Sequence, residues 1–437
     1  MTRMRAVSSW GRLSREMHAT VDLGERARIA PTVQTCPKPA LAGGNGRSYG
    51  DVGLNPGGTL LTTGNLDRFI EFDEQRGEIE CEAGVLLKDI IDLALPRGWF
   101  PPVAPGTQLV TVGGAIANDV HGKSHGRSGS FGNTVKRLTL VRTDGTTIEC
   151  SAEHNADWFA ATVGGMGLTG VISSARLRLQ PVAGPWIDAE TLYFDSLQDF
   201  FALSASAEKE CEYSAAWIDC VRHPRDLVRG FFFRGNHSSD ETPAPRSRST
   251  LFPFTPPLSL VNGISVRVFN ELYCFAKRAG ARRKREHCAH FLFPLDNIRG
   301  WNKVYGPRGF YQYQCVVPAT TQLDATQELL DAIARSGSGS FLTVLKTFGD
   351  VPPRGMLSFP MAGTTLAVDF PNHGAATLAL FDTLNSVVLA AGGRLYAAKD
   401  AAMPRAMFTA GYPRLAEFLP FRDPGISSAM SRRLLGV

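Results

Sequence analysis

The chain has 437 residues, with 46 lysines and arginines against 41 aspartates and glutamates, and a formal net charge of +5 at pH 7. Hydrophobic residues make up 43% and charged residues 20%, which excludes a disordered chain and a polytopic membrane protein. There is no uncharged apolar run of about eighteen residues, so we expect no transmembrane helix. The polar N-terminal stretch is not typical of a secretory signal, and we expect a protein that is cytoplasmic or peripheral at the inner membrane. The weak positive charge gives no argument for nucleic-acid binding.

The glycines are distributed unevenly. Three windows, residues 43–58, 106–132 and 164–170, hold 18 of the 44 glycines. The windows have no period of three, which excludes collagen, and the polar and aromatic residues between the glycines exclude a low-complexity linker. Glycine clusters of this kind are typical of backbone that turns sharply or lies close to a ligand.

The first 180 residues favour short strands separated by turns. Residues 86–95 have helical spacing and are followed by Pro96 and Gly98, which predicts a short helix. Residues 138–150 predict a hairpin around Asp144 and Gly145. Residues 157–162 are helix-like, and the alternation over residues 171–179 predicts a half-exposed strand.

The composition changes near residue 182, where we place a domain boundary. Residues 183–393 are expected to form a second α+β domain, with strands near 311–317, 341–348 and 364–370 and a helix over 375–391. The segment 236–257 is rich in Ser, Thr and Pro, which predicts a long mobile loop.

The segment 277–285 is strongly basic, with six cations in nine residues directly after the apolar run 266–275. One interpretation is a solvated helix face. The other is a basic amphipathic segment that rests on anionic lipid head groups or binds a phosphate-bearing substrate. The eight cysteines show no CxxC pair and no metal-ligand spacing, so we expect reduced, buried thiols and no metal site.

The segment Gly165–Gly170 matches the pattern GxGxxG. A Rossmann loop follows a strand and opens a helix, whereas here a helix-like segment precedes the motif and a strand follows it. The pattern therefore does not favour classical NAD binding.

The other two windows are better candidates for a ligand site. Residues 43–50 hold four glycines, and their amides either form an anion-binding nest or make an ordinary glycine-rich turn. In the second window, His121, Lys123 and His125 stand within five residues, flanked by glycine. A lone histidine is more often structural, but three titratable side chains this close make a functional site about as probable as a structural one.

Through these windows the chain resembles the FAD-binding family of the vanillyl-alcohol oxidase type, and within it the enzymes that oxidise polyprenylphosphoryl pentoses. The matching strings span nearly the whole chain in order: Gly46–Asp51, Val112–Ala117, His121–Lys123, Gly129–Gly132, Tyr213–Trp217, Gln312–Gln314, Leu357–Pro360, Val368–Pro371 and Tyr396–Asp400. The resemblance implies an α+β fold, in which a two-subdomain FAD-binding domain (residues 1–182) is followed by a substrate domain with an antiparallel sheet (183–393). It also implies that residues 394–437 return to the flavin.

The resemblance also implies a role for each matching position. The residues that would bind FAD are Gly43, Gly44, Asn45, Gly46, Arg47, Ser48, Tyr49, Gly50, Asp51, Gly106, Thr111, Val112, Gly113, Gly114, Asn118, Asp119, His121, Val171, Ile172 and Tyr396. Those that would face the substrate are Lys123, Trp217, Gln312, Gln314, Lys346 and Lys399. Lys399, His121 and Tyr49 are the candidate catalytic residues, with Lys399 orienting or deprotonating the substrate hydroxyl. An ordinary surface lysine beside Asp400 is the alternative for Lys399.

Two positions depart from the family pattern. Many relatives have a histidine, covalently attached to the flavin, at the position of Arg47. Arginine cannot form this link, so we expect non-covalent FAD. The best-known relatives have a cysteine two residues before the aspartate of the Val-Asp-Phe-Pro string, where this chain has Ala367. The exact sugar therefore stays open.

The implied reaction is oxidation of a secondary hydroxyl of a polyprenylphosphoryl pentose to a keto sugar, by hydride transfer to flavin N5, in the synthesis of arabinan precursors for the cell wall. A lipid-linked substrate implies work at an anionic membrane surface, peripheral at the inner membrane, and a short-chain dehydrogenase/reductase as the partner that completes an epimerisation. One alternative is a soluble aldonolactone or alditol oxidase of the same flavin family. The other is a non-catalytic flavin-binding subunit.

Overall fold

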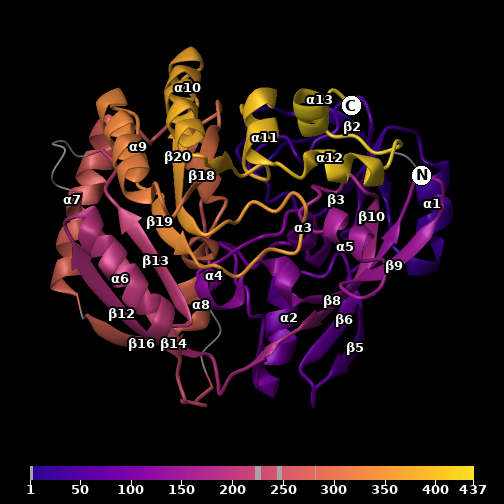
Figure 1. The fold of residues 1–437 in the computed structure, drawn as a ribbon, viewed down its shortest axis with the longest axis horizontal. Coiled ribbons are helices and arrows are strands. Elements are labelled where there is room, and N and C mark those ends of the chain that lie inside the picture. The colour runs from indigo at the N-terminus through magenta and orange to yellow at the C-terminus, as the bar shows by residue number, and fades with distance from the viewer. Residues whose placement is uncertain (1–2, 222–227, 244–248, 281) are drawn as a thin grey trace.

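The computed structural model describes residues 3–221, 228–243, 249–280 and 282–437. It is a mixed α+β fold with two smaller sheets from the N-terminal part of the chain and one large antiparallel sheet from the remainder (Figure 1). The predicted fold class is confirmed. No helix in these described ranges is long and apolar enough to cross a bilayer.

The first small sheet has four strands in the order β1-β2-β4-β3. Its strands are β1 (Arg3–Val7), β2 (Glu16–Asp22), β4 (Thr59–Thr62) and β3 (Ala40–Gly43), and α1 (Ile29–Thr35) connects β2 to β3. β2 and β3 both run parallel to β4. Because β3 ends at Gly43, the first glycine window begins where this sheet ends.

The second small sheet is antiparallel, with five strands in the order β5-β6-β10-β8-β9. These are β5 (Phe69–Asp73), β6 (Glu78–Glu82), β10 (Val171–Arg178), β8 (Val135–Val141) and β9 (Thr147–Ser151). The helices of this part are α2 (Leu87–Ala94), α3 (Val112–Ala117), α4 (His125–Ser128) and α5 (Ala156–Thr162). The predicted helix over 86–95 and the predicted hairpin around Asp144 and Gly145 are confirmed.

The prediction that residues 171–179 form a half-exposed strand is wrong in one respect. β10 is the central strand of its sheet, and its first five residues are all buried. Val171 belongs to one hydrophobic cluster and Ile172 to another, so both faces of the strand are covered. The motif 165–170 lies between α5 and β10, as expected for a segment that is not a Rossmann loop.

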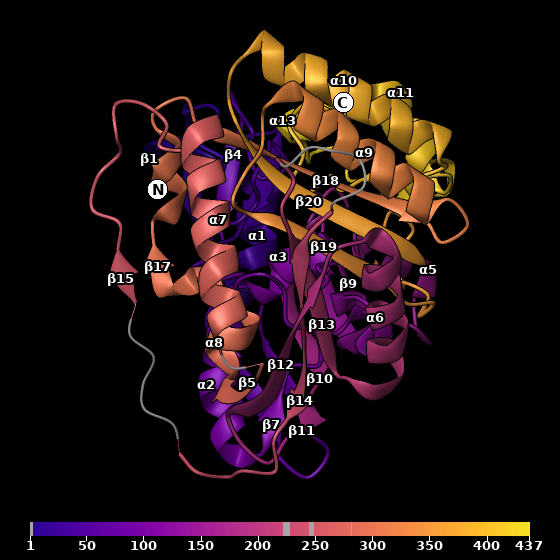
Figure 2. The same cartoon turned by 90° about the vertical axis from the view of Figure 1, so that its left-hand side faces the viewer.

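The large sheet has eight strands, all antiparallel, in the order β16-β12-β14-β13-β19-β20-β18-β21. They are β16 (Arg283–His287), β12 (Trp186–Phe194), β14 (Gly230–His237), β13 (Tyr213–Ile218), β19 (Thr343–Phe348), β20 (Gly363–Pro371), β18 (Phe310–Pro318) and β21 (Arg394–Leu395). Three helices pack on one face of this sheet (Figures 1 and 2): α6 (Leu197–Glu210), α9 (Gln322–Ser336) and α10 (Ala375–Ala390). Side chains that alternate away from these helices therefore point toward the N-terminal half.

Two further helices and two small strand pairs complete this region: α7 (Gly263–Ala279), α8 (Cys288–Leu292), β7 (Trp99–Phe100) with β11 (Gln180–Pro181), and β15 (Thr250–Leu251) with β17 (Ile298–Arg299). The boundary we predict near residue 182 falls between β11 and β12, where the chain enters the large sheet. Of the predicted mobile loop 236–257, residues 236 and 237 belong to β14 and residues 250 and 251 to β15. Residues 244–248 lie outside the described residues, so the mobility of the loop stays a prediction.

The basic segment 277–285 has an unexpected structure. Lys277 and Arg278 end α7, whereas residues 283–285 enter β16, the edge strand of the large sheet. The arginines of this strand pair with carboxylates of the neighbouring strand β12: Arg283 Nε lies 3.0 Å from Glu190 Oε1, and Arg285 Nε lies 2.7 Å from Asp188 Oδ1. Much of the charge that the sequence displays is thus balanced within the protein.

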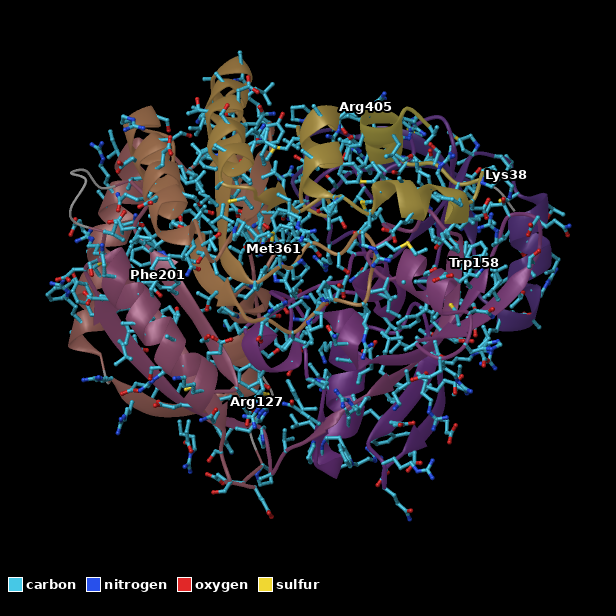
Figure 3. The ribbon with its side chains drawn as sticks, in the orientation of Figure 1. Lys38, Arg127, Trp158, Phe201, Met361 and Arg405 are labelled. Carbon is cyan, nitrogen blue, oxygen red and sulfur yellow. The ribbon has the colours of Figure 1, made fainter. Side chains whose placement is uncertain are left out.

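The C-terminal segment packs against the N-terminal half. Its helices are α11 (Arg405–Gly411), α12 (Leu415–Phe418) and α13 (Ala429–Leu435). Ala40 of β3 donates its N–H to the carbonyl of Gly425 and accepts from the N–H of Ser427. Trp158 on α5, labelled in Figure 3, packs edge-on against Phe421. The last 44 residues therefore connect the large sheet, through β21, to the two small sheets of the N-terminal half.

Arg433 of α13 holds the C-terminal helix in place. Its Nε and Nη2 atoms lie 2.9 and 2.8 Å from the two carboxylate oxygens of Asp51, and Nη2 also lies 2.9 Å from Asp400. Burial raises the pKa of Asp400, and the charge of Arg433 opposes this. Arg433 thus ties the glycine-rich loop, the segment that follows β21 and the C-terminus together.

We predict that Arg433→Met lowers the free energy of unfolding by about 2 kcal/mol, because it leaves two partly buried carboxylates without their cation. Urea denaturation of the purified protein measures this. Arg414→Met is the matched control, since its partner Glu417 is exposed, and it is expected to cost no more than about 0.5 kcal/mol. Equal losses in the two variants would contradict the role of Arg433.

Candidate active site

A cavity of about 850 Å³ lies between the two small sheets and the free face of the large sheet. Its volume is at the upper end of the range for ligand sites, about 300–1,000 Å³. It gathers residues that are far apart in the chain. The predicted site residues in its wall are Gly43, Gly44, Asn45, Gly46, Arg47, Ser48, Tyr49, Gly50, Gly106, Thr111, Gly113, Gly114, Asn118, His121, Lys123, Ile172, Gln312, Gln314, Lys346, Tyr396 and Lys399.

Five predicted residues do not line this cavity: Asp51, Val112, Asp119, Val171 and Trp217. The first four support the wall from behind. Asp51 binds Arg433, Val112 and Val171 are fully buried in hydrophobic clusters, and the Asp119 carboxylate accepts from the hydroxyls of Ser130 and Ser358 and from the N–H of Gly132. These residues hold the loops but do not present their side chains to a ligand in the cavity.

Trp217 is expected in the substrate cavity and lies beside it. It is on the same strand face as Ala215, which lines the cavity. However, Trp217 lies next to α7, with its ring 4.8 Å from that of Tyr273, and its indole N–H donates to the carbonyl of Phe341. Trp217 shares the strand face that lines the cavity, but the helix that covers the end of the strand is a tertiary feature.

The first glycine window forms one wall of the cavity. The carbonyls of Ser48 and Tyr49 accept from the N–H groups of Trp10 and Gly11, at 2.9 and 3.1 Å. No acceptor among the described residues pairs with the backbone N–H groups of residues 45–49. A run of unpaired amides beside a cavity is suited to an anion such as a pyrophosphate.

Gly50 at the end of this loop is required by a close approach. A Cβ atom built there would lie 1.6 Å from the carbonyl oxygen of Asp400. Only glycine therefore allows the loop to lie directly against the segment that carries Lys399.

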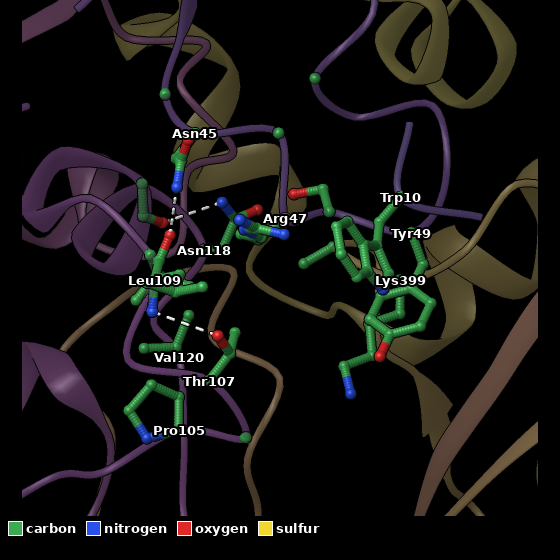
Figure 4. Close-up of a pocket in the computed structure, with 18 of the residues that line it drawn as sticks. Trp10, Asn45, Arg47, Tyr49, Pro105, Thr107, Leu109, Asn118, Val120 and Lys399 are labelled. Carbon is green, nitrogen blue, oxygen red and sulfur yellow. Dashed lines mark hydrogen bonds between the residues drawn. The ribbon is translucent and has the colours of Figure 1, made fainter. Parts of the chain in front are cut away.

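The second glycine window forms the opposite wall. Thr111 caps α3 by accepting from the N–H of Gly114, and Gly113 packs so closely on Ala83, the residue after β6, that an added Cβ would lie 3.0 Å from that of Ala83. Asn45 bridges the two walls, because its side-chain amide donates to the carbonyl of Leu109 at 2.8 Å (Figure 4). Figure 4 shows Trp10, Tyr49 and Lys399 on one side and, on the other, Pro105, Thr107, Leu109 and Val120.

The cavity is open at the positions where a dinucleotide would approach the backbone. Cβ atoms added to Gly46, Gly106 or Gly167 would meet nothing within 4 Å, and all three residues line the cavity. Together with the unpaired amides, this shows that the residues present fit an elongated, phosphate-bearing cofactor such as FAD.

Histidine and lysine side chains meet at the face of the large sheet. His121 is buried, with Gln314 Nε2 3.0 Å from its Nε2 atom and Lys346 Nζ 3.0 Å from its Nδ1 atom. A neutral imidazole has one N–H and one lone pair. The imidazole therefore has a hydrogen-bonding neighbour at each ring nitrogen, and Lys346 also donates to the carbonyl of Gly122 at 3.3 Å.

The electrostatics agree with this arrangement. Burial, and then the charges of Lys346, Lys399 and His125, hold the pKa of His121 well below its usual range. Burial and the neighbouring Lys399 and Lys123 lower the pKa of Lys346 to about 7. His121 therefore stays neutral, whereas Lys346 loses its proton near neutral pH. His125, the third member of the sequence cluster, is buried against Phe348 and does not line the cavity.

A second group of polar side chains surrounds Lys399. Its ammonium lies 5.2 Å from the centre of the Tyr49 ring, and burial lowers its pKa to about 8, against the opposing effect of Asp369. Burial raises the pKa of Asp369 to about 7. Asp369 accepts a hydrogen bond from Gln312 at 2.5 Å and one from Tyr305 at 3.4 Å. Lys399 is thus not an ordinary surface lysine, because it lines a cavity in which its proton is weakly held.

The sequence analysis missed several polar residues in the cavity wall: Asp369, Thr365, Asp296, Arg299 and Lys303. Asp369 had a detectable signal, since it is the one carboxylate in the apolar strand 363–371 and alternates with Ala367 and Thr365. Arg299 and Lys303 lie in a segment without periodicity, and nothing local distinguishes them.

The comparisons with known proteins agree with the site. Residues 19–151 match the model of the FAD binding domain. The chain is 36% identical to decaprenylphosphoryl-beta-D-ribose oxidase of Mycolicibacterium smegmatis, over 99% of this chain and 98% of that protein. It is 32% identical to an uncharacterized protein of Streptomyces coelicolor, over 80% of this chain, and 30% identical to mouse L-gulonolactone oxidase, over 36% of each chain.

We predict that Gly106→Val reduces the FAD bound per protein at least about tenfold, because the added side chain occupies open cavity space instead of displacing protein atoms. The ratio of flavin to protein absorbance measures this. Gly64→Val is the matched control, since a Cβ at Gly64 also meets nothing within 4 Å but that residue does not line the cavity. Normal flavin content in Gly106→Val would place the cofactor elsewhere.

Proposed function

Because the chain belongs to the family of FAD-dependent oxidoreductases that carry this FAD-binding domain, we propose that it oxidises a secondary hydroxyl of a polyprenylphosphoryl pentose to a keto sugar. The observation that carries this proposal is the full-length similarity to decaprenylphosphoryl-beta-D-ribose oxidase. That similarity includes the strands that present Gln312, Gln314, Lys346 and Asp369 to the cavity.

The soluble-oxidase alternative has weaker support. The similarity to L-gulonolactone oxidase covers about a third of either chain, so it leaves most of this protein without a counterpart. We therefore assign the polyprenylphosphoryl class. Ala367 lines the cavity and adds no polar atom there, so the individual pentose is left to experiment. The alternative of a non-catalytic flavin subunit does not explain why lysines with lowered pKa values gather in the cavity.

In this proposal the cluster of polar side chains around Lys399 and the cluster around His121 have different roles. Lys399, as a neutral amine, accepts the proton of the substrate hydroxyl, and Asp369 and Gln312 hold the neighbouring hydrogen bonds. His121, Gln314 and Lys346 orient the sugar on the other side. Tyr49 lies below Lys399 and restricts its position. FAD, when bound, supplies the N5 atom that accepts the hydride from the carbinol carbon.

The keto sugar that the proposed oxidation forms is suited to a second reaction by another enzyme. A keto sugar made from a secondary alcohol becomes the epimeric alcohol when a second enzyme adds hydride to the opposite face. We propose a short-chain dehydrogenase/reductase as this partner, and synthesis of arabinan precursors for the cell wall as the setting.

The direct test is anaerobic reduction of the purified holoprotein. We expect a short-chain polyprenylphosphoryl ribose analogue to bleach the flavin absorbance, and its 2-deoxy counterpart to leave it unchanged. Mass spectrometry should find a product two mass units lighter than the substrate, since two hydrogen atoms are lost. Bleaching by an aldonolactone or an alditol instead would support the soluble-oxidase alternative.

We predict that flavin reduction becomes faster as the pH rises through about 8 and then levels off, because only the neutral amine of Lys399 accepts a proton. Lys399→Arg keeps a cation that does not deprotonate in this range. Both Lys399→Arg and Lys399→Met should therefore slow reduction about a hundredfold or more. An active Lys399→Arg variant would show that the residue acts only as a cation. Lys136→Met, on the exposed side of β8, is the control.

We also propose that FAD is bound without a covalent link. Arg47 stands in the glycine-rich loop with its guanidinium 4.4 Å from the Trp10 ring centre, and arginine has no nucleophilic nitrogen at neutral pH. Acid precipitation should release all of the yellow colour into the supernatant. Colour that stays with the precipitate would contradict this proposal and would call for mapping of the linked residue by peptide mass spectrometry.

A further inference from the structure

Residues 251–275 form an unusually apolar exposed surface, which we call the apolar surface. Nine of the 21 exposed large apolar side chains in the described ranges lie in these 25 residues. Four precede α7: Leu251, Phe254, Leu258 and Leu260. Leu258 is 77% exposed. Isolated exposed apolar residues need no explanation, but a concentration of this kind marks an interaction site.

The rest of the apolar surface is a stripe along α7. Ile264, Val268, Leu272 and Phe275 recur at spacings of four, four and three residues, so they share one side of the helix, and all are more than half exposed. The opposite side, which the protein buries, carries Val266, Asn270 and Cys274. The helix thus turns its more apolar side to the solvent, which is unfavourable unless something covers it.

Cations border the apolar surface. Arg267 and Arg278 are exposed on α7, and Arg299 is exposed on β17. The one carboxylate of α7, Glu271, is ion-paired with Arg229 at 2.7 Å. Apolar side chains flanked by cations complement the head groups of an anionic lipid leaflet.

The apolar surface lies directly outside the cavity wall. β15 pairs with β17, and Lys303 Nζ donates to the carbonyl of Phe252 at 3.3 Å. Ile298, Arg299 and Lys303 line the cavity, so the segment that supports residues 251–260 on one side forms the wall on the other. Figure 2 shows α7 standing beside β15 and β17, away from the helices α9 and α10.

We propose that the apolar surface enters the head-group region of an anionic membrane and brings the cavity wall formed by residues 298–303 next to the bilayer. The choice of a bilayer as the occupant rests on the proposed function, because a polyprenyl chain is held in the membrane and only the sugar has to reach the cavity. The surface that carries this docking is the stripe of α7 with residues 251–260, and not the arginines of β16, which pair with Asp188 and Glu190.

The test is co-sedimentation of the holoprotein with vesicles of phosphatidylglycerol and phosphatidylcholine, and with pure phosphatidylcholine. We expect binding to the anionic vesicles, and the double variant Leu272→Ser/Phe275→Ser should weaken it at least about tenfold. Leu378→Ser/Leu389→Ser on α10 is the matched control, since both leucines are exposed on a helix away from the apolar surface. Arg267→Glu should weaken binding about fivefold at low salt.

A second measurement separates this inference from the proposed function. Leu272→Ser/Phe275→Ser should still oxidise a water-soluble short-chain analogue at the wild-type rate, because neither residue lines the cavity. If the wild type sediments with vesicles but oxidises no polyprenylphosphoryl pentose, the proposed function fails and the docking stands. If the wild-type protein does not sediment with anionic vesicles, or if the double variant binds them as well as the wild type does, the docking proposal is wrong. A wild-type dimer in analytical ultracentrifugation that the double variant dissociates would likewise overturn it, since the occupant would be a second copy.

Discussion

Charge held away from water is the constraint on which the rest of this structure depends. Lys123, Lys346, Lys399 and Asp369 all face one cavity, and burial shifts the pKa of each toward the neutral form. Such a cluster is unfavourable unless a rigid frame maintains it. The frame is made from three distant parts of the chain, and the contact of Arg433 with Asp51 and Asp400 is where the parts meet.

The two halves of the cavity use different chemistry for different ligands. The half that fits the cofactor is built from backbone, with open glycines and unpaired amides that approach a large phosphate-bearing group. The half that faces the large sheet is built from long polar side chains, whose protonation changes near neutral pH. This division suits a protein in which the cofactor is resident and the substrate alone requires proton transfer.

The apolar surface adds a third environment next to the cavity. Residues 298–303 form the cavity wall with one side and support residues 251–260 with the other. A substrate with a polar head and a long hydrocarbon chain needs a polar cavity for the head and, close beside it, an apolar medium for the chain. A bilayer against the apolar surface would provide the second, so that desolvation of the sugar and retention of the lipid take place side by side.

The sequence by itself determined the local features. Glycine spacing located the two loops, and the order of helix and strand around residues 165–170 excluded a Rossmann loop. These follow from backbone geometry that depends on nearest neighbours. Only the tertiary structure decided that α7 covers Trp217, that β16 pairs its arginines with β12, and that Asp369 lies near Lys399. Each depends on contacts between segments far apart in the chain. Local pattern carries no information on which partner will desolvate or neutralise a given side chain.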